Sequence, residues 1–306
     1  MHLALCQYAI ELFEHPHDYR EHLESLIEQA ARRGAELLVM PEYASLVMTG
    51  QMPPDVRGDL HASIAALQPM LPAWLEQCEA LAKRFGIYLV PGSAPVLDND
   101  GVYRNRAWLF GPSGLIGTQD KLIMTRFERE HWGIEGGSGL QVFDTALGKL
   151  GILICYDNEF PMAARLLAEQ GVDLIVSPSC TDTESGYYRV RTGARARALE
   201  NQIAVAVSPT VGEAAWSQAL DYNYGRAGLY VPADIGMPAS GVVAQSEHIT
   251  IDRSSWLHVE LDLSAIADLR DDGQVLLRRD WPEQFDPSRM YVINEESNRN
   301  EESNQG

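Results

Sequence analysis

The sequence GKLGILICYDNEFP, residues 148–161, changes abruptly from apolar to polar. An apolar run begins at Leu150 and stops at Cys155, and a short continuous run of this kind is typical of a strand buried on both faces. The amphipathic sequence MAARLLAEQ then follows Pro161, which suits the first turn of a helix, and Gly171 ends it. We therefore expect a buried strand, a sharp turn and a helix.

Cys155 is expected at the carboxyl end of this strand, near the start of the helix, where Asp157 or Asn158 can serve as the cap. Ligands bind at that edge of open α/β sheets, and the N–H groups of a helix N-terminus favour a thiolate over a thiol. This position suits a nucleophilic cysteine. The alternative is an inert core cysteine, because free cysteine is among the most buried residue types.

Composition limits the classes of protein to consider. The chain has 306 residues, 45% of them hydrophobic, and a formal net charge of −19. Such an acidic chain argues against nucleic acid and anionic membranes as partners, since both require basic patches. No apolar run approaches the roughly 20 residues of a membrane span, and the N-terminal sequence lacks the features of a signal peptide. We therefore expect a cytoplasmic protein.

The cysteines and histidines do not predict a metal site. The four cysteines form no CxxC pair, so a zinc ribbon is not expected. Cys6 and Cys78 fall in a predicted strand and a predicted helix and are expected in the core. His15 and His17 form an HxH pair without a neighbouring set of carboxylates or cysteines.

Apolar runs alternate with helical patterns along most of the chain. The expected strands are residues 2–9, 35–40, 86–91, 103–110, 115–121, 150–155, 172–177 and 202–207. The expected helices are residues 18–33, 60–85 with a break at Pro69 and Pro72, 187–201 and 263–271. Residues 226–262 have the character of hairpins, and residues 122–140 look irregular.

This order predicts an α/β protein with a mixed sheet. We find no linker and no internal repeat, so residues 1–293 are expected to form a single domain. The polar tail at residues 294–306 is rich in Asn, Glu and Ser and is expected to be disordered.

Two further polar residues follow predicted strands directly. Glu42 follows the strand at 35–40, and a partly desolvated carboxylate at a strand end has a raised pKa and can accept a thiol proton. Lys121 ends another strand, where an ammonium near Cys155 would favour the thiolate and stabilise a developing oxyanion. Taken singly, each residue is as readily a solvated surface side chain.

Together these motifs resemble the nitrilase superfamily of carbon–nitrogen hydrolases. The motifs Pro41-Glu42, Asp120-Lys121 and Ile154-Cys155-Tyr156-Asp157 are similar, in order and rough spacing, to the three signatures of that superfamily. The sequences MHLALCQ, AARRGAELLVMPE, VDLIVSPS and ARARALENQIAVAV also look like family elements. The resemblance covers about residues 2–270.

The resemblance implies a fold, a reaction and roles for residues. The fold would be a four-layer αββα sandwich, usually paired in a homodimer or higher homo-oligomer through its outer helices. Glu42 would be the general base, Cys155 the nucleophile, and Lys121 with the Tyr156 backbone N–H the oxyanion hole. A small linear amide would be cleaved through a thioester, releasing ammonia or an amine. No cofactor or metal is implied.

Many family members carry a second glutamate between the lysine and cysteine motifs, and the segment RFEREHWGIEGG offers Glu128, Glu130 and Glu135. Counted back from Gly137 and the following VFDT, Glu130 fits the family spacing best, and Glu128 is the second choice. The TRFEREHW sequence resembles a poorly characterised branch, so the resemblance implies no substrate.

Several residues and activities complete the hypothesis. Tyr43, Cys180 and Tyr187 are expected to line the substrate pocket. Cys180 is the weaker candidate nucleophile, because no helix start or lysine motif accompanies it. The alternative activities are N-carbamoyl hydrolysis, nitrile hydrolysis and acyl transfer to an amine. The alternative outside enzymology is a catalytically silent scaffold of the same fold.

Overall fold

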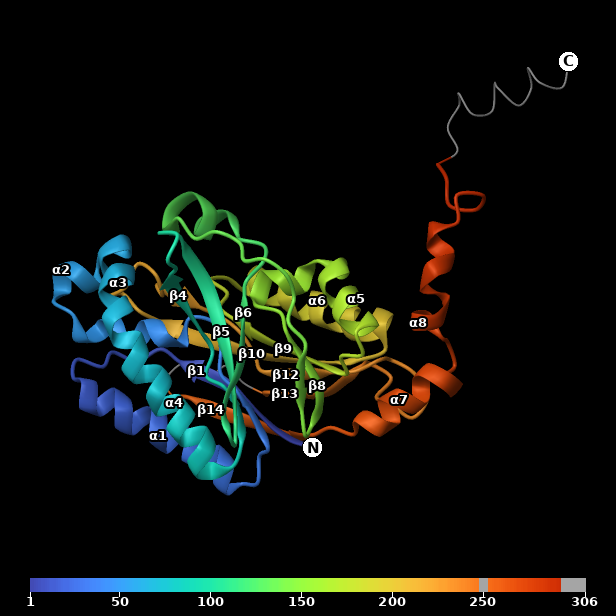
Figure 1. The fold of residues 1–306 in the computed structure, drawn as a ribbon, viewed down its shortest axis with the longest axis horizontal. Coiled ribbons are helices and arrows are strands. Elements are labelled where there is room, and N and C mark those ends of the chain that lie inside the picture. The colour runs from blue at the N-terminus through green and yellow to red at the C-terminus, as the bar shows by residue number, and fades with distance from the viewer. Residues whose placement is uncertain (248–252, 293–306) are drawn as a thin grey trace, which may run out of the picture.

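The computed structural model describes residues 1–247 and 253–292. Strands and helices alternate along these residues as the sequence pattern predicted, and hairpins follow (Figure 1). The predicted disordered tail at residues 294–306 lies outside the described residues. None of the helices in the described ranges is both long and apolar enough to traverse a bilayer.

One half of the strands gathers around β1. β1 pairs in parallel with β2, which pairs in parallel with β3, whereas β3–β5, β4–β5, β5–β6 and β1–β14 are antiparallel. These strands are β1 (His2–Ala9), β2 (Leu37–Val39), β3 (Tyr88–Val90), β4 (Ser93–Leu97), β5 (Tyr103–Gly111), β6 (Gly114–Asp120) and β14 (Ser255–Glu260).

The other half gathers around β9 and β10. β8, β9 and β10 are parallel, and short antiparallel strands flank them. These strands are β7 (Phe143–Thr145), β8 (Gly148–Ile152), β9 (Leu174–Ser179), β10 (Ala204–Glu213), β11 (Tyr222–Asn223), β12 (Gly228–Tyr230) and β13 (Val242–Gln245). The two halves join where Tyr8 and Ala9 of β1 pair with Thr210 and Val211 of β10.

Alternate residues of β1 belong to two different cores, because successive side chains of a strand point to opposite faces. Leu3 and Leu5 pack in the core that includes Ile152 of β8, between the two halves of the sheet. Ala4 and Cys6 pack in the core that includes helices α1 and α4. β1 is therefore buried on both faces, and Cys6 is a core residue, as predicted.

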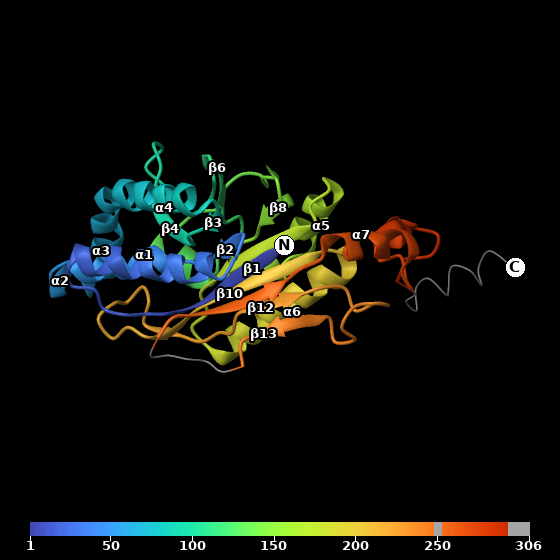
Figure 2. The ribbon, with the colours of Figure 1, turned by 90° about the horizontal axis from the view of Figure 1, so that it is seen from below.

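Helices cover the outer faces of the two halves. α1 and α4 lie on one side of the strands and α5 and α6 on the other (Figures 1 and 2). The helices of the body are α1 (Pro16–Arg32), α2 (Pro54–Arg57), α3 (Leu60–Leu67), α4 (Leu71–Phe85), α5 (Pro161–Glu169) and α6 (Glu184–Asn201). This arrangement of helix, sheet, sheet and helix is the predicted four-layer α/β sandwich.

The predicted 60–85 helix is divided in two near its prolines, as expected. Between α3 and α4 the chain makes only a 3₁₀ turn at Gln68–Met70. Pro72 lies in the first turn of α4, where its missing N–H breaks no helical hydrogen bond. Cys78 is buried in α4, as predicted.

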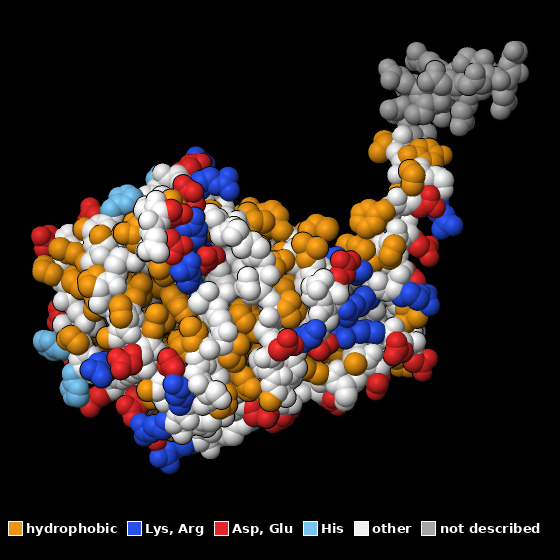
Figure 3. Space-filling view, in the orientation of Figure 1, with side chains coloured by type: hydrophobic (Ala, Val, Ile, Leu, Met, Phe, Trp, Pro, Cys, Tyr) orange, Lys and Arg blue, Asp and Glu red, His pale blue; other side chains and the backbone are white. Residues whose placement is uncertain are grey.

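The last described segment first packs on the body of the protein and then projects from it. α7 (Leu263–Asp272) buries Ile266 in the core, and α8 (Leu277–Asp280) and a 3₁₀ turn at Trp281–Phe285 follow. Figure 1 shows α8 and the residues after it projecting beyond the layers, and Figure 3 shows apolar side chains along this arm. Its end, Met290 to Val292, is exposed.

Candidate active site

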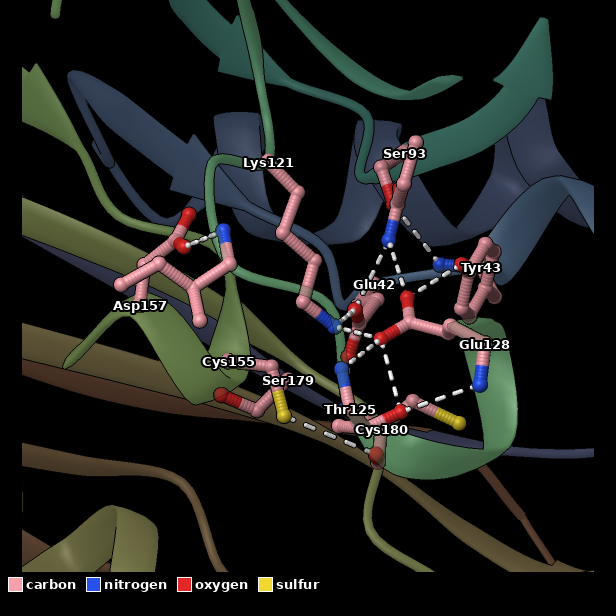
Figure 4. Close-up of polar contacts among 12 residues, drawn as sticks. Glu42, Tyr43, Ser93, Lys121, Thr125, Glu128, Cys155, Asp157, Ser179 and Cys180 are labelled. Carbon is pink, nitrogen blue, oxygen red and sulfur yellow. Dashed lines mark hydrogen bonds and ion pairs between the residues drawn. The ribbon is translucent and has the colours of Figure 1, made fainter. Parts of the chain in front are cut away.

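Three strand ends bring Glu42, Lys121 and Cys155 together (Figure 4). Glu42 follows β2, Lys121 follows β6 and Cys155 follows β8. The Lys121 Nζ atom lies 2.8 Å from the Glu42 Oε1 atom, and both side chains are buried. The charge of Glu42 is among the causes that raise the pKa of the Cys155 thiol, so the two side chains lie within electrostatic reach of each other. The residues that the sequence singled out separately therefore form one cluster.

Cys155 has an unusual backbone conformation. Its φ angle is 47°, in the left-handed region, and it begins a 3₁₀ turn at Cys155–Glu159 that separates β8 from α5. A side chain other than glycine is strained in this region. The turn directs the sulfur atom into the cluster, with Sγ 3.6 Å from the Cys180 carbonyl oxygen.

A close approach of two loops holds the Glu42 strand end in place. Gly92 has a φ angle of 95°, and a Cβ atom added there would lie 2.0 Å from the Pro41 carbonyl oxygen. Only glycine fits this position, so the chain before β4 can pack directly against the residue that precedes Glu42.

Glu128 completes the buried cluster. Its Oε2 atom accepts hydrogen bonds from Lys121 Nζ at 2.6 Å and from the backbone N–H and hydroxyl of Thr125 at 2.9 and 2.8 Å. Its Oε1 atom accepts one from the Tyr43 hydroxyl at 2.6 Å. A single ammonium group therefore lies between two buried carboxylates.

The sequence analysis preferred Glu130 to Glu128 as the second glutamate of the site, and this preference was wrong because Glu130 lies at the surface. The Glu130 carboxylate lies 2.8 Å from Arg126 Nε, and both side chains are largely solvent-exposed. The second choice, Glu128, is the residue that reaches Lys121. Glu128 and Glu130 lie two residues apart in the π-helical turn Glu128–Trp132, so their side chains point to opposite sides and only one of them can reach Lys121.

The two buried carboxylates have different proton affinities. Burial raises the pKa of Glu42 to about 7, although Lys121 opposes the shift, and the charge of Glu128 raises it further. For Glu128, burial is outweighed by the charge and hydrogen bond of Lys121 and by the bond from Tyr43, so its pKa is lowered. The pKa values of the two carboxylates are thus shifted in opposite directions, upward for Glu42 and downward for Glu128.

The Cys155 thiol is neutral at rest. Burial raises its pKa well above the usual value, the charge of Glu42 raises it further, and Lys121 only partly opposes these effects. For Lys121, burial opposes the charged form, but Glu128 and Glu42 raise its pKa, so it is an ammonium. Lys121 thus acts on the Cys155 pKa in the expected direction, but burial and the charge of Glu42 outweigh it.

Asp157 has a different role from the predicted helix cap. α5 begins at Pro161 without a side-chain cap, and Asp157 accepts hydrogen bonds from the backbone N–H groups of Leu122, at 3.1 Å, and Ile123, at 2.8 Å. Burial raises its pKa to about 6. Asp157 thus ties the turn that carries Cys155 to the chain that follows Lys121.

A cavity of about 490 Å³ opens onto the cluster. Glu42, Lys121, Glu128 and Cys155 lie in its wall, and segments 125–132 and 219–223 contribute further lining.

Tyr43, Cys180 and Tyr156 line this cavity as well, and the first two were the expected pocket residues. The third, Tyr187, does not lie in its wall. Its hydroxyl contacts the Gln245 side chain, and its ring packs against Tyr188. The expectation for Tyr187 was therefore wrong.

Sequence reasoning missed one polar residue at the centre of the cluster. The Asn105 amide nitrogen donates to Glu42 Oε1 at 2.8 Å and approaches Glu128 Oε1 at 3.3 Å.

Within residues 1–247 and 253–292, no group of three or more His, Cys, Asp or Glu residues could hold a metal ion.

Comparisons with known proteins identify the family. The carbon-nitrogen hydrolase family model matches residues 2–254. A probable hydrolase of Bacillus subtilis is 40% identical over 166 residues, which are 54% of this chain and 32% of that protein. The present chain thus spans about a third of that relative.

Two further comparisons extend over nearly the whole chain. An omega-amidase of Xenopus laevis is 28% identical over 283 residues, which are 89% of this chain and 91% of that protein. The crystal structure of a carbon-nitrogen hydrolase from Helicobacter pylori superposes with a TM-score of 0.70 at 21% identity, covering 94% of both chains. The chain belongs to the carbon-nitrogen hydrolase family, within the nitrilase superfamily.

Proposed function

We propose that this protein cleaves the carbon–nitrogen bond of a small linear amide through a thioester on Cys155. The observation that carries the proposal is that the Cys155 thiol, the Glu42 carboxylate of near-neutral pKa and the Lys121 ammonium group line the wall of one cavity. The similarity to an omega-amidase supports an amide as the substrate.

In the first half-reaction, Glu42 takes the thiol proton as the Cys155 sulfur attacks the amide carbonyl carbon. The carbonyl oxygen becomes an oxyanion, which Lys121 and the Tyr156 backbone N–H stabilise. Glu42 then gives its proton to the nitrogen as the carbon–nitrogen bond breaks. Ammonia or an amine leaves, and the acyl group remains bound to sulfur as a thioester.

In the second half-reaction, Glu42 takes a proton from water, and the resulting hydroxide attacks the thioester carbonyl. The carbon–sulfur bond breaks, the sulfur recovers the proton from Glu42, and the carboxylic acid leaves. A base with a pKa of about 7 suits both halves, because it accepts and returns a proton with little loss in either direction.

Glu128 would hold the ammonium group in place without exchanging a proton. Its carboxylate accepts hydrogen bonds from Lys121, Thr125 and Tyr43, which stabilise the ionised form. Among the described residues, Lys121 Nζ donates only to Glu128 and Glu42. Its third N–H is thus available for the oxyanion.

The first test is ammonia release from a panel of small amides, N-carbamoyl amino acids and nitriles, with Cys155→Ala measured beside the wild type. We expect release by the wild type and a loss of at least about 10³-fold in the variant, because the nucleophile is removed. Full activity of Cys155→Ala would refute the proposal. The class of compound that reacts separates amide, carbamoyl and nitrile hydrolysis, and a new amide formed with an added amine would indicate acyl transfer.

Thiol labelling separates an enzyme from a silent scaffold. Cys155 lies in the cavity wall, whereas Cys78 is buried in α4. We expect Cys155 to react with a thiol reagent faster than Cys78 at neutral pH. Equal reactivity, together with no ammonia release from the panel, would favour the scaffold.

We also propose that residues 1–293 act as one cytoplasmic domain that pairs with a second copy through the outer helices. Apolar side chains on the outer face of α5, Met162 and Leu166, are about half exposed. Light scattering should give twice the chain mass, and replacing both residues by Glu should give the monomer. A monomeric wild type would contradict the pairing.

A further inference from the structure

Asn105 contacts both carboxylates of the cluster and the lysine backbone. It lies in β5, and its side chain is completely buried. Its amide nitrogen lies 2.8 Å from Glu42 Oε1 and 3.3 Å from Glu128 Oε1. The backbone carbonyl oxygen of Asn105 accepts the backbone N–H of Lys121 at 2.8 Å. One residue of β5 therefore contacts all three charged residues.

The other end of the Asn105 amide is unsatisfied. Its Oδ1 atom is buried and has no hydrogen-bond partner among residues 1–247 and 253–292. Burying an unpaired acceptor costs about 1–3 kcal/mol, so an apolar side chain of similar size would serve packing better. What asparagine adds at this position is the pair of N–H donors directed at Glu42 and Glu128.

Asn105 does not contact the substrate directly. It lies outside the residues that line the cavity, behind Glu42 and Glu128, which do line it. A change at Asn105 can therefore reach the reaction only through these carboxylates.

We propose that Asn105 is a positioning residue that holds Glu42 in the ionised, proton-accepting state by donating an N–H group to each of the two carboxylates. Two negative charges in a buried site repel each other, and donors shared between them offset that repulsion. This inference rests on the proposed function, in which Glu42 is the base.

The sign of the expected effect follows from the groups around Glu42. The positive charge of Lys121 favours ionised Glu42, the negative charge of Glu128 opposes it, and burial opposes it most. The other titratable groups that face this cluster are Tyr43, Cys155, Asp157 and Cys180. Removing the Asn105 donor weakens the ionised form, so Glu42 should require a higher pH to lose its proton.

The experiment compares Asn105→Ala and Asn105→Asp with the wild type. The pH profile is measured twice, as kcat/KM for the best amide of the panel and as the rate of Cys155 alkylation by iodoacetamide. We expect the acid limb of both profiles to move up by about one to two pH units, the equivalent of one hydrogen bond to a charged group. At pH 7 kcat should fall by about 10- to 100-fold, while KM stays within about 2-fold.

Ser93→Ala is the matched control. Ser93 is also completely buried, and its hydroxyl accepts the backbone N–H of Tyr43 at 3.1 Å without contacting either carboxylate. The acid limb of both pH profiles of Ser93→Ala should lie at the same pH as in the wild type. Asn105→Asp keeps the side-chain volume, so it still tests the proposal where Asn105→Ala unfolds.

The outcomes separate the proposal from its alternatives. An unmoved acid limb in the folded Asn105 variants, with activity falling equally at all pH values, would mean that Asn105 only packs and would overturn the inference. If the wild type released no ammonia from any compound, the proposed function would fail. The alkylation profile would then still decide whether Asn105 controls the ionisation of Glu42.

Discussion

Two ion pairs a few residues apart differ sharply in their surroundings. Lys121 Nζ lies 2.6 Å from Glu128 Oε2, and the side chains are 1% and 4% exposed. Arg126 Nε lies 2.8 Å from Glu130 Oε2, and the side chains are 86% and 46% exposed. The distances are nearly equal, so distance alone does not show which pair matters.

Burial distinguishes the two pairs. In water, ions of opposite charge attract weakly and salt screens them, whereas a dry site strengthens the attraction and also penalises every unpaired charge. The Lys121–Glu128 pair lies in such a site and shares its ammonium with Glu42. A cation–carboxylate pair thus belongs to a buried charged cluster in one place and is a solvated contact in the other.

The largest effect is expected from replacing the buried cation, Lys121, and the exposed cation, Arg126, serves as the control. Lys121→Met leaves two buried carboxylates without their ammonium, so we expect a loss of about 3–5 kcal/mol in the free energy of unfolding. Hydrolysis should fall at least about 10³-fold, because the oxyanion loses its charged partner. Arg126→Met should change stability by less than about 0.5 kcal/mol. Urea unfolding and ammonia release measure both, and equal effects of the two variants would contradict the comparison.

Replacing the acidic partners should have the next largest effect. Glu128→Gln removes the negative charge that raises the pKa of Lys121 and weakens the hydrogen bond between the two side chains. We therefore expect kcat to fall about 10²- to 10³-fold. Glu130→Gln should retain nearly full activity because its carboxylate lies at the surface. Steady-state kinetics with both variants provide the measurement. Loss of activity in Glu130→Gln alone would show that Glu130, and not Glu128, is the second glutamate of the site.

A smaller effect concerns pH. The wild type should lose activity as the pH falls below about 7, because Glu42 becomes protonated and can no longer accept the thiol proton. Since the charge of Glu128 raises the pKa of Glu42, the acid limb in Glu128→Gln should move to lower pH, by about one unit. Alkylation of Cys155 between pH 5 and 9 follows this limb even where hydrolysis is slow. A shift to higher pH would show that Glu128 does not repel Glu42.

The smallest effect concerns salt. A double-mutant cycle between Arg126 and Glu130 should give a coupling of at most about 0.5 kcal/mol in dilute buffer, and nearly none in 0.5 M salt. The activity of the wild type should change little over the same range, because its charged cluster is buried. A salt-sensitive kcat would indicate that solvent reaches Lys121.

Part of the site followed directly from the sequence. Glu42, Lys121 and Cys155 each come after a predicted strand, and strand ends meet at one edge of an α/β sheet. Their convergence could therefore be predicted without side-chain detail. Which of Glu128 and Glu130 points inward could not, because the sequence of residues 122–140 looked irregular and gave no periodicity that distinguishes one side of the turn Glu128–Trp132 from the other.

The two positioning residues were missed for different reasons. Asn105 lies between Arg104 and Arg106 in a segment for which the sequence predicted only a strand. Its neighbours pair with Asp98, whereas the strand alternation turns Asn105 inward, on the face that also carries buried Ala107. A polar residue on an otherwise apolar face was the available signal.

Asp157 was assigned to a helix cap on sequence spacing alone. Its carboxylate instead accepts hydrogen bonds from backbone N–H groups that follow Lys121, far away in the sequence. Propensities describe neighbours along the chain, so a contact of this kind becomes visible only once the fold brings the two loops together.

The left-handed backbone at Cys155 has an evolutionary consequence. A residue with a side chain pays of order 1 kcal/mol or more to adopt this conformation, and glycine does not. Cys155→Gly should therefore cost little stability, or even raise it, while destroying activity. A lineage released from selection for catalysis is therefore expected to lose this cysteine early, because glycine would relieve the strain.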